Sequence, residues 1–362
     1  MKLIIEPNDG VAPIVTAIKN ARKSVDIVIF RFGYGGIEAA LKAAVVKGVK
    51  VTALIANTNR GGVKNLRELE MRFLAAGIVV ARTDDDLIRY HDKFIIIDRR
   101  ILYMLSFNLT RLDIDRSRGF GIVTKNAKLV QEAVKLFEAD CTRGVYTPKL
   151  DTFVVSPGNA RKVLGTFLKR AKSQLLIFDP KISDKEMISI LRGRAKAGID
   201  IRIIGRMVGQ FEPAVKKPTS MRLHTRTIIR DQRQAFVGSQ SLRLEELDSR
   251  RELGLIVRDS KIIKRLVDTF ESDWAAHEAT KERKVENEET AVVPNKDTEK
   301  ATQILAQEMR PISVTLKKAV KKAVADAGEA FEQTMVKKVV KKMVKKAVKD
   351  AVKEAAQEST EQ

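Results

Sequence analysis

The sequence predicts an α/β fold in which two similar domains are followed by a helical, lysine-rich tail. Three observations indicate this. Short runs of β-branched residues alternate with segments of helical periodicity, as in domains whose helices pack on a sheet. The same order of segments begins again near the middle of the chain. Beyond about residue 280 the composition becomes charged and repetitive, which is typical of a linker and a surface helix rather than a packed domain.

The first half alternates predicted strands with predicted amphipathic helices. The helical segments carry apolar residues at three- and four-residue spacing, and Gly48 and Gly77 are expected to end two of them. The strands are expected at Leu3–Ile5, Val25–Phe30, Val49–Ile55, Ile78–Ala81 and Phe94–Ile97, and the helices at Ile14–Arg22, Ile37–Lys47 and Val63–Ala76.

The pattern of the first half is repeated in the second. LIIEPNDGVAPIVTAIKNARKSVDIVIF, from Leu3, matches FVVSPGNARKVLGTFLKRAKSQLLIF, from Phe153, in its order of strand, proline turn, helix, basic corner and apolar strand. The halves also end alike, in VQEAVKLFEADC and IKRLVDTFESDW. A copy of about 140 residues is too long for a solenoid repeat. We therefore predict two like domains, residues 1–145 and 150–280, packed around a pseudo-twofold axis with a shared cleft.

The remaining residues divide into a predicted linker and a predicted tail. Residues 281–310 are charged, poor in apolar side chains and contain Pro294, as expected of a flexible segment. Residues 311–356 repeat a unit of two lysines and two apolar residues, as in KKVVKKMVKKAVKDAVKEAA. Each unit advances about 400° on a helix, so the apolar residues form one drifting stripe flanked by lysines. Such a basic amphipathic helix could bind an anionic membrane surface, bind nucleic acid or only keep the protein soluble, and the sequence favours neither of the first two uses over the other.

The charge of the chain indicates an anionic partner. The formal net charge is +22 and the isoelectric point is about 10.0, which suits nucleic acid, anionic lipid headgroups or phosphorylated metabolites alike. Cys141 is the single cysteine, so no intrachain disulfide can form and a buried structural thiol is expected. The N-terminal apolar run is too short for a signal peptide, and no run reaches the roughly 18 to 20 residues of a membrane span. We expect a cytoplasmic protein, either peripheral at the inner membrane face or associated with the nucleoid.

Two of the three histidines stand at matching places in the two halves. The sequence YHDKFIIID in the first half and LHTRTIIRD in the second have the same spacing of histidine, basic residue and aspartate. A serine follows each histidine after 15 residues, in LSFNLT and GSQSL. The residues of the two motifs are His91, Lys93, Asp98 and Ser106 in the first half, and His224, Arg226, Asp231 and Ser239 in the second. The side chains at His91 and Lys93 are expected to leave the same face of a strand and to meet one phosphate.

This duplicated HxKx4D pattern, followed by a GSxN-like turn, resembles the phospholipase D superfamily, including bacterial phospholipase D-like and cardiolipin synthase-like proteins. The resemblance covers nearly everything from residue 1 to about residue 280. It implies two phospholipase D-like α/β sandwich domains that form a pseudo-dimer within one chain. It also implies cleavage of a phosphodiester through a phosphohistidine intermediate, without a metal or another cofactor.

The resemblance assigns roles to particular residues. His91 is the expected nucleophile, and His224 the expected acid and base. Lys93 and Arg226 would neutralise phosphate oxygens, whereas Asp98 and Asp231, which complete the two motifs, would hold the architecture or orient partners. Further hydrogen bonds to the phosphate are expected from Ser106, Asn108, Ser239 and Ser241. Glu252, in RRELGLIV, matches the carboxylate that supports a histidine in other members. Its first-half counterpart is missing, because RSRGFGIV carries no acid there.

Three departures from the family pattern bear on activity. Arg226 replaces lysine and presents a planar fork instead of a compact ammonium. Leu105 replaces the usual glycine before the serine, which is expected to tighten the turn. Ser241 stands where asparagine is common, although the neighbouring Gln240 could compensate. These departures favour a divergent enzyme over an inactive one.

Three functions remain open from the sequence. The leading hypothesis is a phospholipase D-type phosphodiesterase that cleaves a phospholipid headgroup ester; the second is a metal-independent nuclease of the same superfamily. The third is a catalytically weak binding protein for anionic polymers. The missing membrane span argues against an integral cardiolipin synthase. Lys216 and Lys217 could line a substrate groove or lie on a solvated loop, and His277, which has no motif around it, is expected to be structural.

Overall fold

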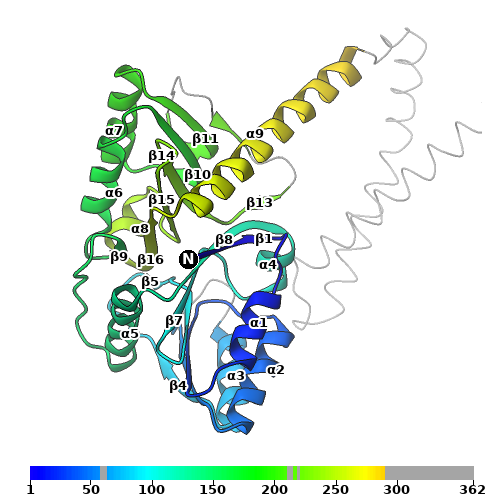
Figure 1. The fold of residues 1–362 in the computed structure, drawn as a ribbon, viewed down its shortest axis with the longest axis vertical. Coiled ribbons are helices and arrows are strands. Elements are labelled where there is room, and N and C mark those ends of the chain that lie inside the picture. The colour runs from blue at the N-terminus through cyan, green and yellow to red at the C-terminus, as the bar shows by residue number, and fades with distance from the viewer. Residues whose placement is uncertain (58–62, 210–214, 218–220, 290–362) are drawn as a thin grey trace, which may run out of the picture. The chain divides into compact units, whose positions relative to one another are not determined.

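A computed structural model describes residues 1–57, 63–209, 215–217 and 221–289. The chain divides into two compact units, residues 1–285 and residues 286–362. Both predicted domains belong to the first unit (Figure 1). The predicted tail at 311–356 and the linker beyond residue 289 lie outside the described residues.

The first half forms a sheet in the order β1-β8-β7-β6-β2-β3-β4. Strands β2, β3 and β4 pair in parallel, and the other neighbours are antiparallel. Its elements are β1 (Lys2–Glu6), α1 (Ala12–Lys19), β2 (Ser24–Ile29), α2 (Gly35–Val46), β3 (Lys50–Ile55), α3 (Val63–Ala75), β4 (Val79–Arg82), β5 (Arg89–Tyr90), β6 (Phe94–Ile97), β7 (Ile101–Leu105), α4 (Arg111–Asp115), β8 (Ser117–Thr124) and α5 (Ala127–Thr142).

The second half repeats this arrangement. Its sheet has the order β12-β11-β10-β14-β15-β16, in which β10, β11 and β12 are parallel and β14, β15 and β16 antiparallel. The elements are β9 (Phe153–Ser156), α6 (Ala160–Lys169), β10 (Gln174–Ile182), α7 (Lys185–Lys196), β11 (Asp200–Met207), β12 (Val215–Lys216), β13 (Arg222–Leu223), β14 (Arg226–Arg230), β15 (Gln234–Gly238), α8 (Leu244–Asp248), β16 (Arg250–Val257) and α9 (Ser260–Glu289).

The predicted α/β fold with two similar domains is confirmed. Every strand and helix predicted for the first half is present, with ends shifted by at most three residues. Gly48 and Gly77 follow the ends of α2 and α3 with φ of 81° and 77°, in the region that glycine adopts without strain. Helix α9 runs to Glu289, past the predicted start of the linker at 281, because KERKVENEE consists largely of good helix formers. The exact boundaries at 145, 150 and 310 stay predictions.

Helices cover the outer faces of the sheets, and a shared core joins the halves. Figure 1 shows α1, α2 and α3 together against the first sheet, and α6 and α7 against the second. Between the sheets, residues of α5 and α9 pack with both inner faces in one apolar cluster. Phe178 lies 5.5 Å from Phe120 and 5.0 Å from Phe270 between ring centroids, both edge-on. Such pairs contribute about 0.5–1.5 kcal/mol beyond the area they bury.

Short strands cross from each half to the last strand of the other. Strand β5 of the first half pairs in parallel with β16, and β13 of the second half pairs in parallel with β8. The motif histidines are 133 positions apart, and the same offset relates β5 to β13 and β8 to β16. Two ion pairs with this offset also join the halves, Arg118 with Asp273 at 2.8 Å and Arg251 with Asp140 at 2.9 Å. Each histidine directly follows one of the crossing strands.

Candidate active site

His91 is oriented by a residue of the other half. Because β5 pairs with β16, the backbone N–H of His91 donates to the carbonyl of Arg251 at 2.7 Å. The ring nitrogen Nδ1 lies 2.9 Å from a carboxylate oxygen of Glu252, which is fully buried. The Phe30 ring packs edge-on with the imidazole of His91, with 4.6 Å between the ring centroids. The structure therefore places the carboxylate of Glu252 beside Nδ1 of His91, and its supporting role stays a prediction.

His224 occupies the equivalent place in the second half but has different partners. Its backbone N–H donates to the carbonyl of Arg118 at 3.0 Å. Its Nδ1 lies 2.9 Å from the backbone carbonyl oxygen of Ser106, where His91 has a carboxylate. Its Nε2 lies 3.3 Å from Nδ2 of Asn108 and 3.7 Å from a carboxylate oxygen of Asp113.

These contacts determine the tautomer of both rings. A carboxylate and a carbonyl can only accept a hydrogen bond, so Nδ1 carries the proton in His91 and in His224. Nε2 of each neutral ring therefore keeps its lone pair. A nucleophile and a general base both require this lone pair.

Burial keeps both histidines neutral in the free protein. It holds the pKa of His91 well below the ordinary 6.5, and the charges of Lys93 and Arg226 lower it further. Burial likewise lowers the pKa of His224, although the carboxylate of Asp113 opposes this shift. An anionic phosphodiester bound between them would raise both values, because negative charge favours the imidazolium form.

Lys93 and Arg226 each donate a hydrogen bond to the backbone carbonyl of the histidine two residues earlier in the chain. The Lys93 ammonium donates to the carbonyl of His91, and Nη1 of Arg226 donates to the carbonyl of His224 at 2.7 Å. Burial lowers the pKa of Lys93 to about 7, with the nearby Glu252 carboxylate opposing the shift. Arg226 thus makes the same contact with the carbonyl of its histidine as Lys93 makes in the first half.

Arg226 and Ser241, which both depart from the family pattern, bond each other. Nε of Arg226 donates to the hydroxyl of Ser241 at 3.2 Å and lies 3.8 Å from Glu246. The small hydroxyl of Ser241 accepts this hydrogen bond from the longer arginine side chain. At the equivalent place in the first half, Asn108 faces His224 instead. Gln240 does not act in its place, because its amide donates to the backbone carbonyl of Val154.

Leu105 does not tighten its turn, contrary to the expectation. It is buried in β7 opposite Gly121, at the position where the second half pairs Gly238 with Gly254. An added Cβ at Gly121 would lie 2.9 Å from a methyl group of Leu105. The glycine across the ladder therefore makes room for the larger residue.

The two motif serines are bonded to the adjacent strand. The hydroxyl of Ser106 accepts the backbone N–H of Phe120 at 2.9 Å, and that of Ser239 accepts the N–H of Leu253 at 3.1 Å. Both side chains are fully buried. Their predicted contact with phosphate stays a prediction, whereas their attachment to β8 and β16 is observed.

Asp98 and Asp231 lie at the far ends of their strands and contact neither histidine. Each carboxylate accepts hydrogen bonds from three successive backbone N–H groups at the corner before β2 or β10. Burial alone would raise their pKa, but these N–H groups hold the pKa of both below the ordinary value. This geometry fits the architectural role predicted for them.

Sequence reasoning missed two acids beside the site. Asp113 on α4 and Glu246 on α8 are also 133 positions apart, and both are buried. Asp113 bonds Asn108 and Arg222, whereas Glu246 accepts the N–H of Ser241 at 2.7 Å. Extending the register of the motifs past the serines would have found both positions.

The missing counterpart of Glu252 is Gly119, which has the same offset. An added Cβ at Gly119 would lie only 2.7 Å from the ring of Phe107, so no acid fits there without repacking. Phe107 is fully buried. The site is therefore asymmetric, with one carboxylate at Nδ1 of His91 and none at Nδ1 of His224.

The remaining predicted groups lie apart from the histidines. Nζ of Lys216 lies 4.0 Å above the Trp274 ring, and Lys217 is exposed. The side chain of His277 is outside the described part of the chain. Within the described residues, no cluster of three or more His, Cys, Asp or Glu side chains could hold a metal ion. No helix in this part of the chain is long and apolar enough to cross a membrane.

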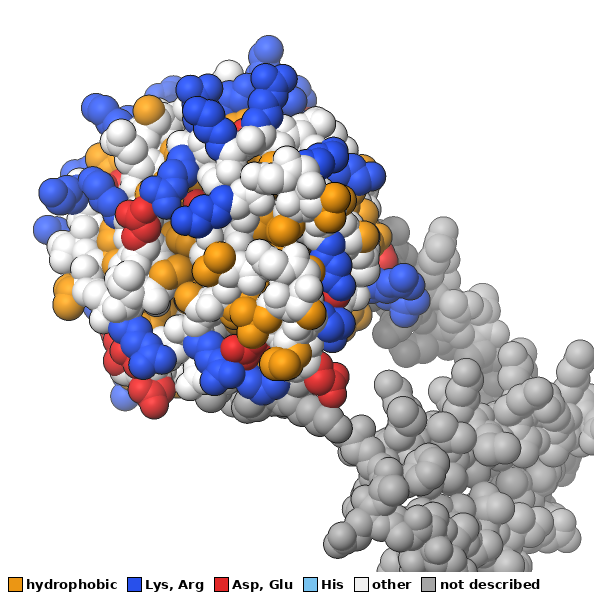
Figure 2. Space-filling view, turned by 90° about the horizontal axis from the view of Figure 1, so that it is seen from below, with side chains coloured by type: hydrophobic (Ala, Val, Ile, Leu, Met, Phe, Trp, Pro, Cys, Tyr) orange, Lys and Arg blue, Asp and Glu red, His pale blue; other side chains and the backbone are white. Residues whose placement is uncertain are grey.

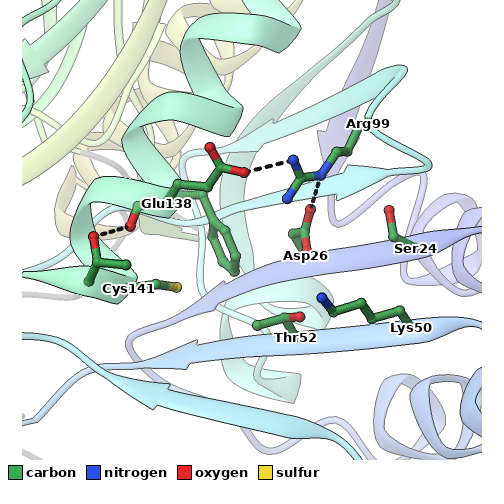
Figure 3. A pocket seen from close by; sticks show the side chains of 9 residues that line it. Ser24, Asp26, Lys50, Thr52, Arg99, Glu138 and Cys141 are labelled. Atoms are coloured by element: carbon green, nitrogen blue, oxygen red, sulfur yellow. Dashed lines mark hydrogen bonds and ion pairs between the residues drawn. The ribbon is translucent and has the colours of Figure 1, made fainter.

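A cavity of about 470 Å³ lies between α5 and strands β2 and β3 (Figure 3). Inside it, Arg99 lies 2.7 Å from Glu138 and 3.7 Å from the buried Asp26. Cys141 lies half-buried at its edge, and burial raises the pKa of its thiol to about 12. None of the predicted site residues is among its lining residues.

The fold is that of phospholipase D-like proteins. It resembles phosphatidylserine synthase from Haemophilus influenzae Rd KW20 with a TM-score of 0.59 and 12% identity, over 76% of this chain and 86% of that one. It resembles polyphosphate kinase from Porphyromonas gingivalis with a TM-score of 0.63 and 19% identity, over 75% of this chain. The match spans 49% of the kinase, about half of its length. No curated protein matches the chain.

The family follows from the sequence match. The family model described as cardiolipin synthase, PLD-like domain, matches residues 14–141 and 164–274, which together exceed half of the chain. The chain belongs to this family of the phospholipase D superfamily. Membership of this family supports phosphodiester-transfer chemistry.

Proposed function

We propose that this protein is a phosphodiesterase that cleaves a phospholipid headgroup ester through a phosphohistidine on His91. One observation carries the proposal. Two buried histidines from equivalent positions of the two copies each donate from Nδ1, which leaves both Nε2 atoms for chemistry. A cation accompanies each histidine, the buried Lys93 beside His91 and the partly buried Arg226 beside His224.

In the first step Nε2 of His91 attacks phosphorus, and the bond from phosphorus to the leaving oxygen breaks. Because the bound phosphodiester raises the pKa of His224, this ring is then an imidazolium that carries a proton on Nε2 as well as on Nδ1. The Nε2 proton passes to the leaving oxygen, which departs as an alcohol. Glu252 accepts the Nδ1–H of His91 and stabilises the positive charge that develops on its ring. Lys93 and Arg226 compensate the charge on the non-bridging phosphate oxygens.

In the second step water attacks phosphorus and displaces His91. The now neutral His224 takes the proton of the water at Nε2, so the starting protonation states return. Both steps use the same two nitrogen atoms, and the phosphate need not leave the site between them.

The lipid substrate is supported by the family, whose model is that of cardiolipin synthase. In this proposal the basic tail holds the enzyme at an anionic membrane surface. A nucleic-acid diester is the second candidate. Residues 1–280 carry a net charge of +18 and residues 281–362 only +4. Lys and Arg side chains are accordingly spread around the face drawn in Figure 2, as an extended polyanion would require.

The substrate can be tested with the native chain in excess chelator. Vesicles of phosphatidylglycerol and single-stranded DNA are supplied separately, and released alcohol or shortened strands are measured. Turnover of the lipid alone supports the proposal, and turnover of DNA alone replaces it with the nuclease. If bis(p-nitrophenyl) phosphate is not hydrolysed either, the phosphodiesterase proposal is wrong.

Replacing Arg226 by lysine distinguishes an enzyme from a degenerate binding protein. We expect Arg226→Lys to lower kcat/KM about tenfold. Lysine has a methylene group where arginine has Nε, so the hydrogen bond to Ser241 is lost even where the ammonium still bonds the His224 carbonyl. The double variant Arg226→Lys with Ser241→Asn restores the first-half combination and should recover part of the loss. Activity that rises in the single variant would instead indicate a binding protein whose second motif has decayed.

A further inference from the structure

The two histidines differ in which ring nitrogen faces a carboxylate. In His91 it is Nδ1, 2.9 Å from Glu252. In His224 it is Nε2, 3.7 Å from Asp113, whereas Nδ1 faces a backbone carbonyl. A carboxylate at Nδ1 leaves Nε2 with its lone pair, but a carboxylate near Nε2 favours a proton on that atom.

We propose that Asp113 is the positioning residue of His224: its carboxylate favours the proton on Nε2 and thereby makes His224 the proton donor. The inference rests on the proposed function. Asp113 replaces the acid that is missing at Gly119, but from the other side of the ring. It comes from α4 instead of β8, because Phe107 occupies the space beside Gly119.

The contacts of Asp113 fix its carboxylate in this place. The residue is 2% exposed. One oxygen binds Arg222, and the other accepts Nδ2 of Asn108 at 2.7 Å and faces His224. Thr110 caps α4 by accepting the backbone N–H of Asp113 at 3.2 Å, so the helix start is fixed as well.

The charge on Asp113 agrees with this role. Burial would raise its pKa, but His224, the Asn108 hydrogen bond and Arg222 hold the pKa below its ordinary value. The residue is therefore an anion at neutral pH. Glu246, at the same position of the second copy, forms ion pairs with three arginines, and its charge raises the pKa of His91 less than burial, Lys93 and Arg226 lower it. In this proposal the histidine whose Nε2 lies beside a carboxylate, His224, is the acid, and the histidine whose Nδ1 lies beside one, His91, is the nucleophile.

The test uses two esters that share the phosphatidyl group and differ in the leaving group. Phosphatidyl-p-nitrophenol releases a phenolate that departs without an acid, whereas phosphatidylglycerol needs its alkoxide protonated. We expect Asp113→Asn to lower kcat/KM for phosphatidylglycerol on the order of 100-fold, the scale of general acid catalysis, and for the nitrophenyl ester less than about fivefold. Asp113→Glu should recover part of the first rate.

Arg222→Gln is the matched control, because it removes the other partner of Asp113 and leaves the carboxylate beside His224. Since Arg222 also helps to hold the Asp113 carboxylate, this variant should change the ratio of the two rates much less than Asp113→Asn does. If Asp113→Asn lowers kcat/KM for both esters by the same factor, Asp113 is only structural and the inference is wrong. The same holds if Arg222→Gln changes the ratio of the two kcat/KM values as much as Asp113→Asn does. Failure of the native chain on both esters would instead contradict the lipid proposal; thymidine 5′-(p-nitrophenyl phosphate) and a thymidine dinucleotide then provide the same comparison.

Discussion

The variant His91→Asn should lower kcat by at least about 10³-fold, because no other nucleophile lies at that position. Asparagine cannot form a phosphoramidate at this position, so neither a steady rate nor a burst of p-nitrophenolate is expected from phosphatidyl-p-nitrophenol. The measurement is rapid mixing with an enzyme concentration close to that of the ester. A burst that survives His91→Asn would show that another group is the nucleophile.

His224→Asn should fail at a different step. The phenolate leaves without an acid, so a burst of about one equivalent should appear, and the phosphoenzyme should then persist because no base activates water. Mass spectrometry of the quenched protein should find the phosphatidyl group on the peptide that contains His91. His277→Asn, which changes the third histidine, is the control and should behave like the native chain. Reversed behaviour of the His91 and His224 variants would exchange their roles.

Much of the fold followed from local patterns in the sequence. Apolar runs such as Phe94–Ile97 are buried in the centre of a sheet, and Gly48 and Gly77 end helices because of their backbone conformation. These features depend on residues close together in the chain. The duplication then predicted the second domain, since equal patterns form equal elements.

The partners across the two halves could be predicted only in part. Glu252 was expected to support a histidine, but that it reaches His91 depends on the pairing of β16 with β5. Similarly, the turn sequence LSFNLT does not show that Ser106 offers its carbonyl to His224 while its hydroxyl faces β8. The contacts of the two histidines with Glu252 and Ser106 join residues more than 100 positions apart.

The departures from the family pattern became interpretable only as pairs. Arg226 fits because Ser241 accepts its Nε, and Leu105 fits because Gly121 faces it. Each residue viewed by itself suggested a damaged motif. A substitution in a packed site is tolerated when its neighbour changes volume or polarity to match.

Glu252→Gln should lower kcat/KM on the order of 100-fold while the protein stays folded. Glutamine can still accept the Nδ1–H of His91, but it carries no charge to stabilise the ring as the bond to phosphorus forms. The buried Lys93 would lose the carboxylate that favours its ammonium form, so phosphate binding should weaken too. The burst rate with phosphatidyl-p-nitrophenol measures this step directly, because it contains only the attack by His91.

Glu132→Gln is the matched control for this variant. Glu132 is a buried glutamate on α5 that accepts hydrogen bonds from Tyr146 and Lys149 and touches no motif residue. Glu132→Gln should lower the unfolding midpoint but leave the burst rate unchanged. Glu252→Gln should lower the burst rate but leave the unfolding midpoint unchanged. A Glu252→Gln burst as fast as that of the native chain would mean that Nδ1 of His91 needs only an acceptor. The negative charge that compensates the developing positive charge on the His91 ring would then have to come from the bound phosphate itself.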